Sequence, residues 1–209
     1  MNWDEFDADR LRKMASRMTS GAADVALHGD HALNPDVAVL LNGSEFREAA
    51  VLIPVVNRRF GAGLLLTRRT ETMRKHSGQI AFPGGAIDPG DASPEAAALR
   101  ETREEIGLTG DAVETICRLP PYLTATGFRI TPILALIPPG YELAINAEEV
   151  DAAFEVPFSF VMNPENHKRE SRLWQGKERF YYGITYGEHY IWGVTAGIVR
   201  VLYERLNLA

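Results

Sequence analysis

Three glutamates in the stretch ALRETREEIGL (98–108) have a spacing that could bind a metal ion. Glu101, Glu104 and Glu105 stand at positions i, i+3 and i+4, which share one helix face because each residue turns about 100°. Like charges at this spacing destabilise a helix by about 0.2–0.5 kcal/mol per pair. A divalent cation between the carboxylates would relieve that repulsion. Carboxylate oxygens suit Mg²⁺ or Mn²⁺, and such an ion can bridge a diphosphate and lower the pKa of an attacking water.

The surroundings of these glutamates favour a metal site over the alternative, a solvent-exposed acidic face. We expect the acids to lack the Lys or Arg partners at i,i+4 that an exposed acidic face commonly has. A glycine-rich turn containing Gly84 and Gly85 precedes the helix. Its backbone carbonyls can share a hard cation with the carboxylates, which adds Gly85 to the predicted metal ligands.

The helix that carries the acids has clear start and stop signals. Ser93, followed by a proline and a glutamate, is expected to cap its N-terminus, and Gly107 to end it. Leu99, Thr102 and Ile106 fall on the side opposite the acids. We therefore predict that this apolar side packs on a sheet, while the acidic side faces a cleft or solvent.

The rest of the chain supplies the elements that must hold this helix. An amphipathic helix is predicted over about 4–18 and a closing helix over 191–206. Runs of β-forming residues predict strands, with one hairpin turning at 57–61 and another at 175–177; the runs are 49–56, 63–69, 114–123, 130–137, 170–174 and 179–187. This order favours an α/β (α+β) sandwich over repeated βαβ units. Residues 1–45 are predicted to form an N-terminal extension and residues 46–209 the main domain.

The segment GGAIDPGDASPEAAALRETREEIGL (84–108) closely resembles the Nudix box, G-x5-E-x7-R-E-U-x-E-E-x-G-U, where U is apolar. Asp91 stands where the pattern has Glu, the spacer from Asp91 to Arg100 is one residue longer than in the pattern, and Thr102 fills an apolar position. The resemblance implies a Nudix-type α/β/α sandwich with a mixed β-sheet. It also implies metal binding by Glu101, Glu104 and Glu105, with Arg100 orienting these acids.

The stretch LLTRRTETMRKHSGQIAFPGG (65–85) resembles a signature of the coenzyme A pyrophosphatase subgroup of that family. The resemblance implies hydrolysis of the diphosphate in CoA or its derivatives to 3′,5′-ADP and 4′-phosphopantetheine. Because phosphate geometry suits bidentate arginine, Arg69 and Arg74 are the leading candidates to bind the 3′-phosphate. The alternatives are an ADP-ribose or other nucleoside-diphosphate pyrophosphatase, and a non-catalytic nucleotide-sensing module. Trp192 and Phe128 could stack on adenine or serve in packing.

A further carboxylate follows the strand at 130–137. By resemblance, Glu149 is expected to be an extra metal ligand or the general base. The alternative is that Asn146 caps a helix and Glu149 is its capping-box partner.

Composition limits the classes of partner. The chain has 209 residues and a net charge of −6, which argues against bulk nucleic-acid binding and favours a small nucleotide substrate. No signal-like or membrane-spanning run is present in the sequence, so we expect a cytoplasmic protein. The only cysteine, Cys117, is expected to be a small packed residue. Whether the chain forms a homodimer stays open.

Overall fold

The computed structural model describes residues 3, 7–20, 28–37, 45–59, 61–71 and 78–208. The helices are α1 (Ala8–Ser20), α3 (Pro94–Ile106), α4 (Phe158–Val161) and α5 (Val194–Leu208), with short 3-10 turns at Asp30–Ala32, Gly110–Ala112 and Pro164–Asn166. The strands are β1 (His28–Gly29), β2 (Arg47–Val56), β3 (Gly63–Arg69), β4 (Ile80–Ala81), β5 (Gly84–Ala86), β6 (Glu114–Arg118), β7 (Tyr122–Leu123), β8 (Phe128–Ile137), β9 (Val150–Pro157), β10 (Lys168–Trp174), β11 (Lys177–Tyr186) and β12 (His189–Trp192). None of the helices among these residues combines the length and apolar character needed to span a bilayer.

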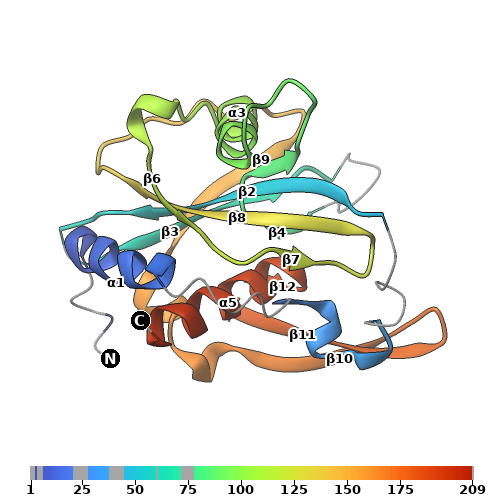
Figure 1. Cartoon of the computed structure of the whole chain (residues 1–209). Helices are drawn as coiled ribbons and strands as arrows, with labels where there is room; N and C mark the ends of the chain where they lie inside the picture. Colours follow the sequence, from blue (N-terminus) through green and yellow to red (C-terminus); the bar gives the residue numbers. More distant parts are fainter. Residues whose placement is uncertain are drawn as a thin grey trace.

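A large mixed sheet forms the centre of the molecule (Figure 1). Strands β2 and β8 run parallel through a long register, from Arg47 opposite Phe128 to Val56 opposite Ile137. Strands β2 and β3 form the predicted hairpin and pair antiparallel, with Val55 opposite Leu64. Strand β9 continues the sheet on the far side of β3. A separate antiparallel sheet has the order β10-β11-β12 and includes the second predicted hairpin.

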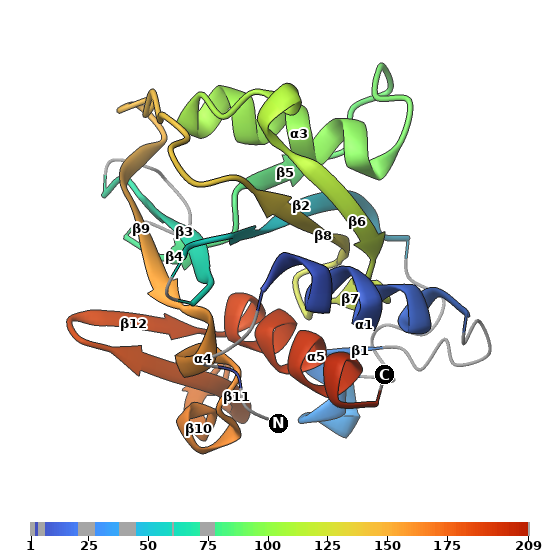
Figure 2. The same cartoon turned by 90° about the vertical axis from the view of Figure 1, so that its left-hand side faces the viewer.

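Helices cover both faces of the large sheet (Figures 1 and 2). Helix α3 lies on one face, where its Ala97 and Ala98 pack in a cluster with Leu52 and Ile133. Helix α5 lies on the other face, between the large sheet and the three-stranded sheet. The predicted α/β/α sandwich with a mixed β-sheet is confirmed.

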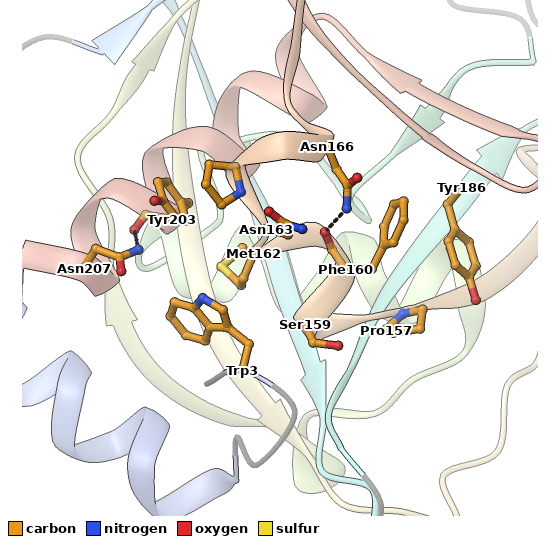
Figure 3. A pocket seen from close by; sticks show the side chains of 11 residues that line it. Trp3, Pro157, Ser159, Phe160, Met162, Asn163, Asn166, Tyr186, Tyr203 and Asn207 are labelled. Carbon is orange, nitrogen blue, oxygen red and sulfur yellow. Dashed lines mark hydrogen bonds between the residues drawn. The ribbon is translucent and has the colours of Figure 1, made fainter. Parts of the chain in front are cut away.

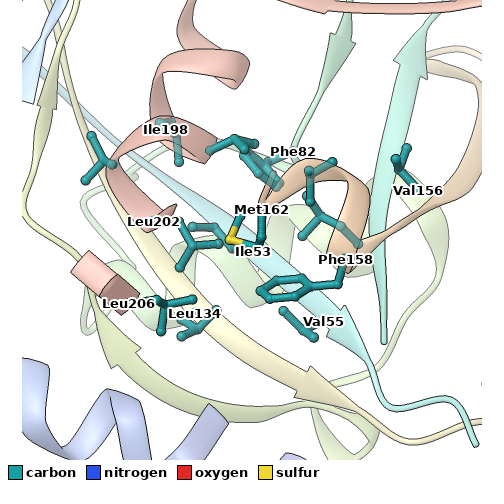
Figure 4. Close-up of a cluster of buried hydrophobic side chains, with 14 of the residues drawn as sticks. Ile53, Val55, Phe82, Leu134, Val156, Phe158, Met162, Ile198, Leu202 and Leu206 are labelled. Carbon is teal, nitrogen blue, oxygen red and sulfur yellow. The ribbon is translucent and has the colours of Figure 1, made fainter. Parts of the chain in front are cut away.

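The larger core lies between the large sheet and α5 (Figure 4). Leu202 and Leu206 of α5 meet Ile53, Leu134 and Phe158, and all five are fully buried. Burying side chains of this size contributes about 1.5–3 kcal/mol each, so this layer is a main source of the fold's stability. Half-buried Cys117 packs against the same core, and burial raises the pKa of its thiol to about 11.

The ends of α3 follow their sequence signals. The Ser93 hydroxyl oxygen accepts a hydrogen bond from the Ala96 amide at 3.2 Å. Gly107 adopts φ = 73°, and its amide donates to the Arg103 carbonyl at 2.9 Å. Both predicted ends of the helix are therefore confirmed.

The predicted start of the closing helix is wrong by three residues. Ile191 and Trp192 belong to strand β12, where Ile191 pairs with Ile184. Gly193 has φ = 64°, which breaks the strand, and α5 begins at Val194. Ile191 faces the same core as the apolar residues of α5. Its spacing from them therefore resembles that of a helix although it lies in a strand.

Described residues of the predicted extension, among them those of α1 and β1, pack against the rest of the chain. Leu11, Met14 and Ala15 of α1 are buried in the same core as α5, and β1 pairs in parallel with β7. Arg12 forms an ion pair with Glu114 of β6 at 2.6 Å. The division of the chain into an extension and a main domain at residue 45 stays a prediction.

Candidate active site

The backbone that precedes α3 in the chain packs against the part of this helix that carries Glu101. Gly85 lies in β5, which pairs antiparallel with β2 and packs beside α3. A Cβ atom at Gly85 would lie 2.6 Å from Cδ and from Oε2 of Glu101. The predicted turn at Gly84 and Gly85 is therefore a short strand, and only a glycine lets the Glu101 carboxylate lie directly on it.

Glu105 does not lie on an exposed acidic face, which corrects the sequence prediction. It is only 2% exposed, whereas the side chain of Glu104 is 49% exposed. Seven residues correspond to a rotation of about 700°, so Glu105 lies within about 20° of Ala98 around the helix axis. Ala98 packs on the sheet, and Glu105 is therefore carried inward with it.

The buried Glu105 carboxylate has two close partners. Its Oε2 accepts a hydrogen bond from the Gly84 amide at 3.2 Å, and its Oε1 lies 3.2 Å from Nη1 of Arg69. Burial raises the pKa of Glu105 to about 7, opposed by the Gly84 amide and Arg69 and reinforced by the negative charges of Glu101 and Glu149. The fold thus places a carboxylate with a strongly perturbed pKa at the loop, which is typical of functional sites.

Arg100 links the exposed and half-buried acids. It donates to Oε1 of Glu101 at 2.8 Å and to Oε2 of Glu104 at 3.3 Å. The second contact is an i,i+4 pair, so the expectation that the acids lack such partners is wrong. Asp91 in turn accepts two hydrogen bonds from Arg100, at 2.9 and 3.1 Å, and Arg100 holds the pKa of Asp91 below its usual value.

Asp91 therefore positions Arg100 among the acids, a role that its spacing in the sequence did not indicate. In the sequence, Asp91 is only an acid nine residues before Arg100. The path of the loop between them, which brings the two side chains together, does not follow from the sequence.

Glu149 lies in a turn that also contacts the buried acid. The Asn146 amide donates to the Glu105 carbonyl at 2.9 Å, and the Thr70 amide donates to the Glu149 carbonyl at 3.0 Å. Strand β9 begins at the next residue, Val150, so no helix follows Asn146. The capping-box alternative is therefore wrong.

The structure places one of the two predicted phosphate-binding arginines. Arg69 ends strand β3, is 22% exposed at its side chain, and is paired with Glu105. Arg74 lies outside the described residues.

The residues present fit a hard divalent cation. Candidate donors are the carboxylates of Glu101, Glu104, Glu105 and Glu149 and the carbonyl of Gly85, all of them oxygen ligands suited to Mg²⁺ or Mn²⁺. A cation would also stabilise the charged form of buried Glu105. As the side chains stand, no three acidic, imidazole or thiol groups of the described residues are grouped closely enough for a metal site. Binding of a metal ion would therefore require these carboxylates to come closer together.

A pocket of about 810 Å³ opens beside this site. Gly84, Gly85 and Arg69 line one part of it, and its walls continue to Arg172 and Trp192 of the three-stranded sheet. Its size is that of a site for a nucleotide-like small molecule. Phe128 and Trp192, considered in the sequence as stacking residues, both lie in its lining.

A second hollow, of about 700 Å³, lies around α4 and the end of α5 (Figure 3). Trp3, Phe160, Tyr186 and Tyr203 contribute to its lining. Its described lining carries no acidic or basic side chain, and we assign no chemistry to it.

Comparisons with known proteins identify the family of the chain. A family model described as NUDIX domain matches residues 46–179. A protein of Enterobacter sp. (strain 638), named Uncharacterized Nudix hydrolase NudL, is 46% identical over 162 residues, covering 78% of this chain and 84% of the relative. A protein of the same name from Escherichia coli (strain K12 / DH10B) is 44% identical over 162 residues, with the same coverage. A cocrystal structure of the NUDIX domain of Shewanella oneidensis NrtR with ADP ribose has a TM-score of 0.49 and 15% identity, covering 82% of this chain and 98% of that one. The domain match over more than half of the chain, supported by relatives of this similarity, shows that the protein belongs to the Nudix hydrolase family.

Proposed function

We propose that the protein hydrolyses the diphosphate of coenzyme A or its derivatives, giving 3′,5′-ADP and 4′-phosphopantetheine, with Mg²⁺ or Mn²⁺ as cofactor. The observation that carries the hydrolase chemistry is the contact of Glu101 and Glu105 with the β5 glycines Gly84 and Gly85, which line a pocket of about 810 Å³. The choice of CoA is supported by the resemblance of residues 65–85 to the CoA pyrophosphatase signature.

The roles of the residues follow from their positions. A bound divalent cation would neutralise diphosphate oxygens and lower the pKa of a water molecule. Glu101, Glu104, Glu105 and the Gly85 carbonyl are the proposed ligands. Arg100 holds the side chains of Glu101 and Glu104 in place through its hydrogen bonds.

The remaining proposed site residues act on the water and the substrate. The Glu149 carboxylate, whose charge reaches Glu105, is proposed to take a proton from the attacking water or to serve as an extra ligand. Arg69 and Arg74 are proposed to bind substrate phosphates, because a guanidinium can form two parallel hydrogen bonds to one phosphate. Gly84 and Gly85 allow the substrate to approach the backbone closely.

Two other functions fit the family and are separated by one experiment. The purified protein is incubated with CoA, ADP-ribose, NADH, diadenosine polyphosphates and dNTPs, with and without Mg²⁺ or Mn²⁺, and the products are identified by mass. We expect metal-dependent release of 3′,5′-ADP from CoA. Preference for ADP-ribose would overturn the CoA assignment, and no turnover of any substrate would favour a sensing module.

Glu104→Gln is the matched variant for this assay. Its side chain is half exposed, so the substitution is expected to leave the melting temperature nearly unchanged. Loss of charge stabilisation by a metal amounts to several kcal/mol, which corresponds to about a thousandfold lower turnover. Turnover close to that of the wild type would contradict the role given to Glu104.

A further inference from the structure

One face of the three-stranded sheet gathers arginines and aromatic rings. Because side chains alternate along a strand, the strand register places Arg172, Arg179, Tyr181 and Trp192 on the same face. The opposite face carries Ile184, which is fully buried towards α5. All four residues of the first face line the same pocket as Gly84 and Gly85 of β5.

Two of these residues form an unfavourable pair. Arg172 and Arg179 stand directly opposite each other in the β10–β11 register. Like charges at this position destabilise a sheet. Asp36 is shared by Arg179, at 2.6 Å, and Lys177, at 3.3 Å. One carboxylate therefore serves two cations, and the cluster keeps a positive charge in a chain whose net charge is −6.

Both arginines line the pocket and have donor groups that no described residue uses. The Nε atom of Arg179 is buried and has no hydrogen-bond partner among the described residues. The guanidinium carbon of Arg172 lies 4.4 Å from the centre of the Trp192 ring, and no carboxylate within the described part of the chain is paired with it. The buried Arg179 donor without a partner is unfavourable, and Arg172 is an exposed cation that a ligand can reach. This pair is therefore suited to an anionic ligand.

The aromatic residues add a second element of recognition. Trp192 has Arg172 over its ring, and Tyr181 meets it edge-on with ring centres 5.4 Å apart. Trp174, at the end of the same strand as Arg172, also lines the pocket. Flat aromatic and guanidinium surfaces of this kind stack on nucleobases.

We propose that this face binds the nucleoside half of the substrate, with Arg172 and Arg179 holding a phosphomonoester on its ribose and Trp192 stacking on its base. This inference rests on the proposed hydrolysis of a CoA-type diphosphate and specifies where its extra phosphate binds. The sequence favoured Arg69 and Arg74 for that phosphate. Arg69, however, is paired with Glu105 at the other part of the pocket, close to the proposed diphosphate position.

Direct binding tests the proposal without metal and without turnover. Titration calorimetry compares adenosine 3′,5′-bisphosphate with AMP, which lacks the 3′-phosphate, on the full-length protein. The wild type is expected to prefer the bisphosphate by at least about tenfold, the effect of one charge-assisted hydrogen bond. Arg172→Gln is expected to lower this ratio about tenfold while leaving AMP affinity nearly unchanged. Trp192→Leu is expected to weaken both ligands to a similar extent.

Arg169→Gln is the matched control. Arg169 belongs to the same strand but to the opposite face, where its guanidinium lies 4.3 Å from the centre of the Phe180 ring. This variant is expected to keep the wild-type ratio. Equal weakening of both nucleotides by Arg172→Gln, or the same loss of ratio in Arg169→Gln, would overturn the proposal, as would tighter binding of a pantetheine fragment to this face.

The substrate panel distinguishes failure of this inference from failure of the proposed function. If the wild type cleaves CoA but Arg172→Gln keeps the bisphosphate preference, the proposal for this face is overturned and the proposed function stands. If CoA is not cleaved but the preference depends on Arg172, the proposed function fails and the phosphate-binding face is supported.

Discussion

Burial of Glu105 makes stability dependent on pH near neutrality. Burial raises the pKa of Glu105 to about 7, whereas its ordinary value is 4.5. Between these values the folded protein keeps a proton that the unfolded chain has released, so stability falls as pH rises. We expect the metal-free melting temperature to fall between about pH 5 and 8, by ~2–4 °C per kcal/mol lost.

Glu105→Gln isolates this effect because it removes one titration. Burial lowers the pKa of His28 and of His167, and these groups change stability in the opposite direction over an overlapping range. The difference between the wild-type and Glu105→Gln melting curves should therefore widen with pH in favour of the variant. Parallel curves from pH 5 to 8 would contradict the perturbed pKa of Glu105.

Glu149 is expected to matter for turnover and not for folding. Its carboxylate makes one long hydrogen bond, 3.4 Å from the Asn146 side-chain amide, so Glu149→Gln removes little packing. If Glu149 is the general base, kcat should fall by about 100-fold or more. Steady-state kinetics at saturating metal measure this.

The neighbouring acid gives the control for that experiment. Glu148 is exposed. Its hydrogen bonds with the side chains of Thr70 and Asn146 are made by its backbone carbonyl and amide. Glu148→Gln should keep wild-type kcat. Equal values of kcat in the two variants would exclude Glu149 as base or ligand.

At the scale of elements, strand β5 contains two glycines with different roles. Gly84 has φ = 146°, and a Cβ there would lie 2.6 Å from the Val51 Cα and meet the Ala50 carbonyl. Gly84→Ala should therefore destabilise the β2–β5 pairing and lower the melting temperature by several degrees.

Gly85→Ala should instead reduce activity with a smaller effect on stability. The added methyl group meets only the flexible end of Glu101, which can move aside at little energy. The predicted contrast is measured by melting temperature and kcat in both variants. A larger loss of stability in Gly85→Ala than in Gly84→Ala would contradict this assignment.

Local signals made much of this region predictable from sequence. The ends of α3 depend on Ser93 and Gly107, whose effects act within one turn, and both hairpins depend on short turns. The inward position of Glu105 was not predicted, because a charged residue is expected at the surface. Its position around the helix axis, close to that of Ala98, indicates the buried side. The hydrogen bonds between Asp91 and Arg100 depend on the path of a loop. The position of Arg172 opposite Arg179 depends on the register of two strands. Sequence spacing alone does not give these.

At the scale of the whole molecule, α1 and the acids of α3 lie on opposite sides of the large sheet. Helix α3, which carries the acids, lies on one face of the large sheet, and α1 and α5 lie on the other (Figure 2). Substitutions of the buried residues of α1 are therefore expected to lower the free energy of unfolding without changing the positions of the acids of α3.

Leu11→Ala tests this separation. Leu11 is fully buried in the core that α1 shares with α5, and truncating such a side chain costs about 2–5 kcal/mol through lost burial and the cavity left behind. For a chain of this size the melting temperature should fall by about 4–20 °C. Well below that temperature, kcat should match the wild type, because α1 makes no contribution to the acid cluster. Lys13→Ala, on the exposed side of the same helix, should change neither quantity. A loss of kcat in folded Leu11→Ala would show that the packing beneath α1 is coupled to the carboxylates across the sheet.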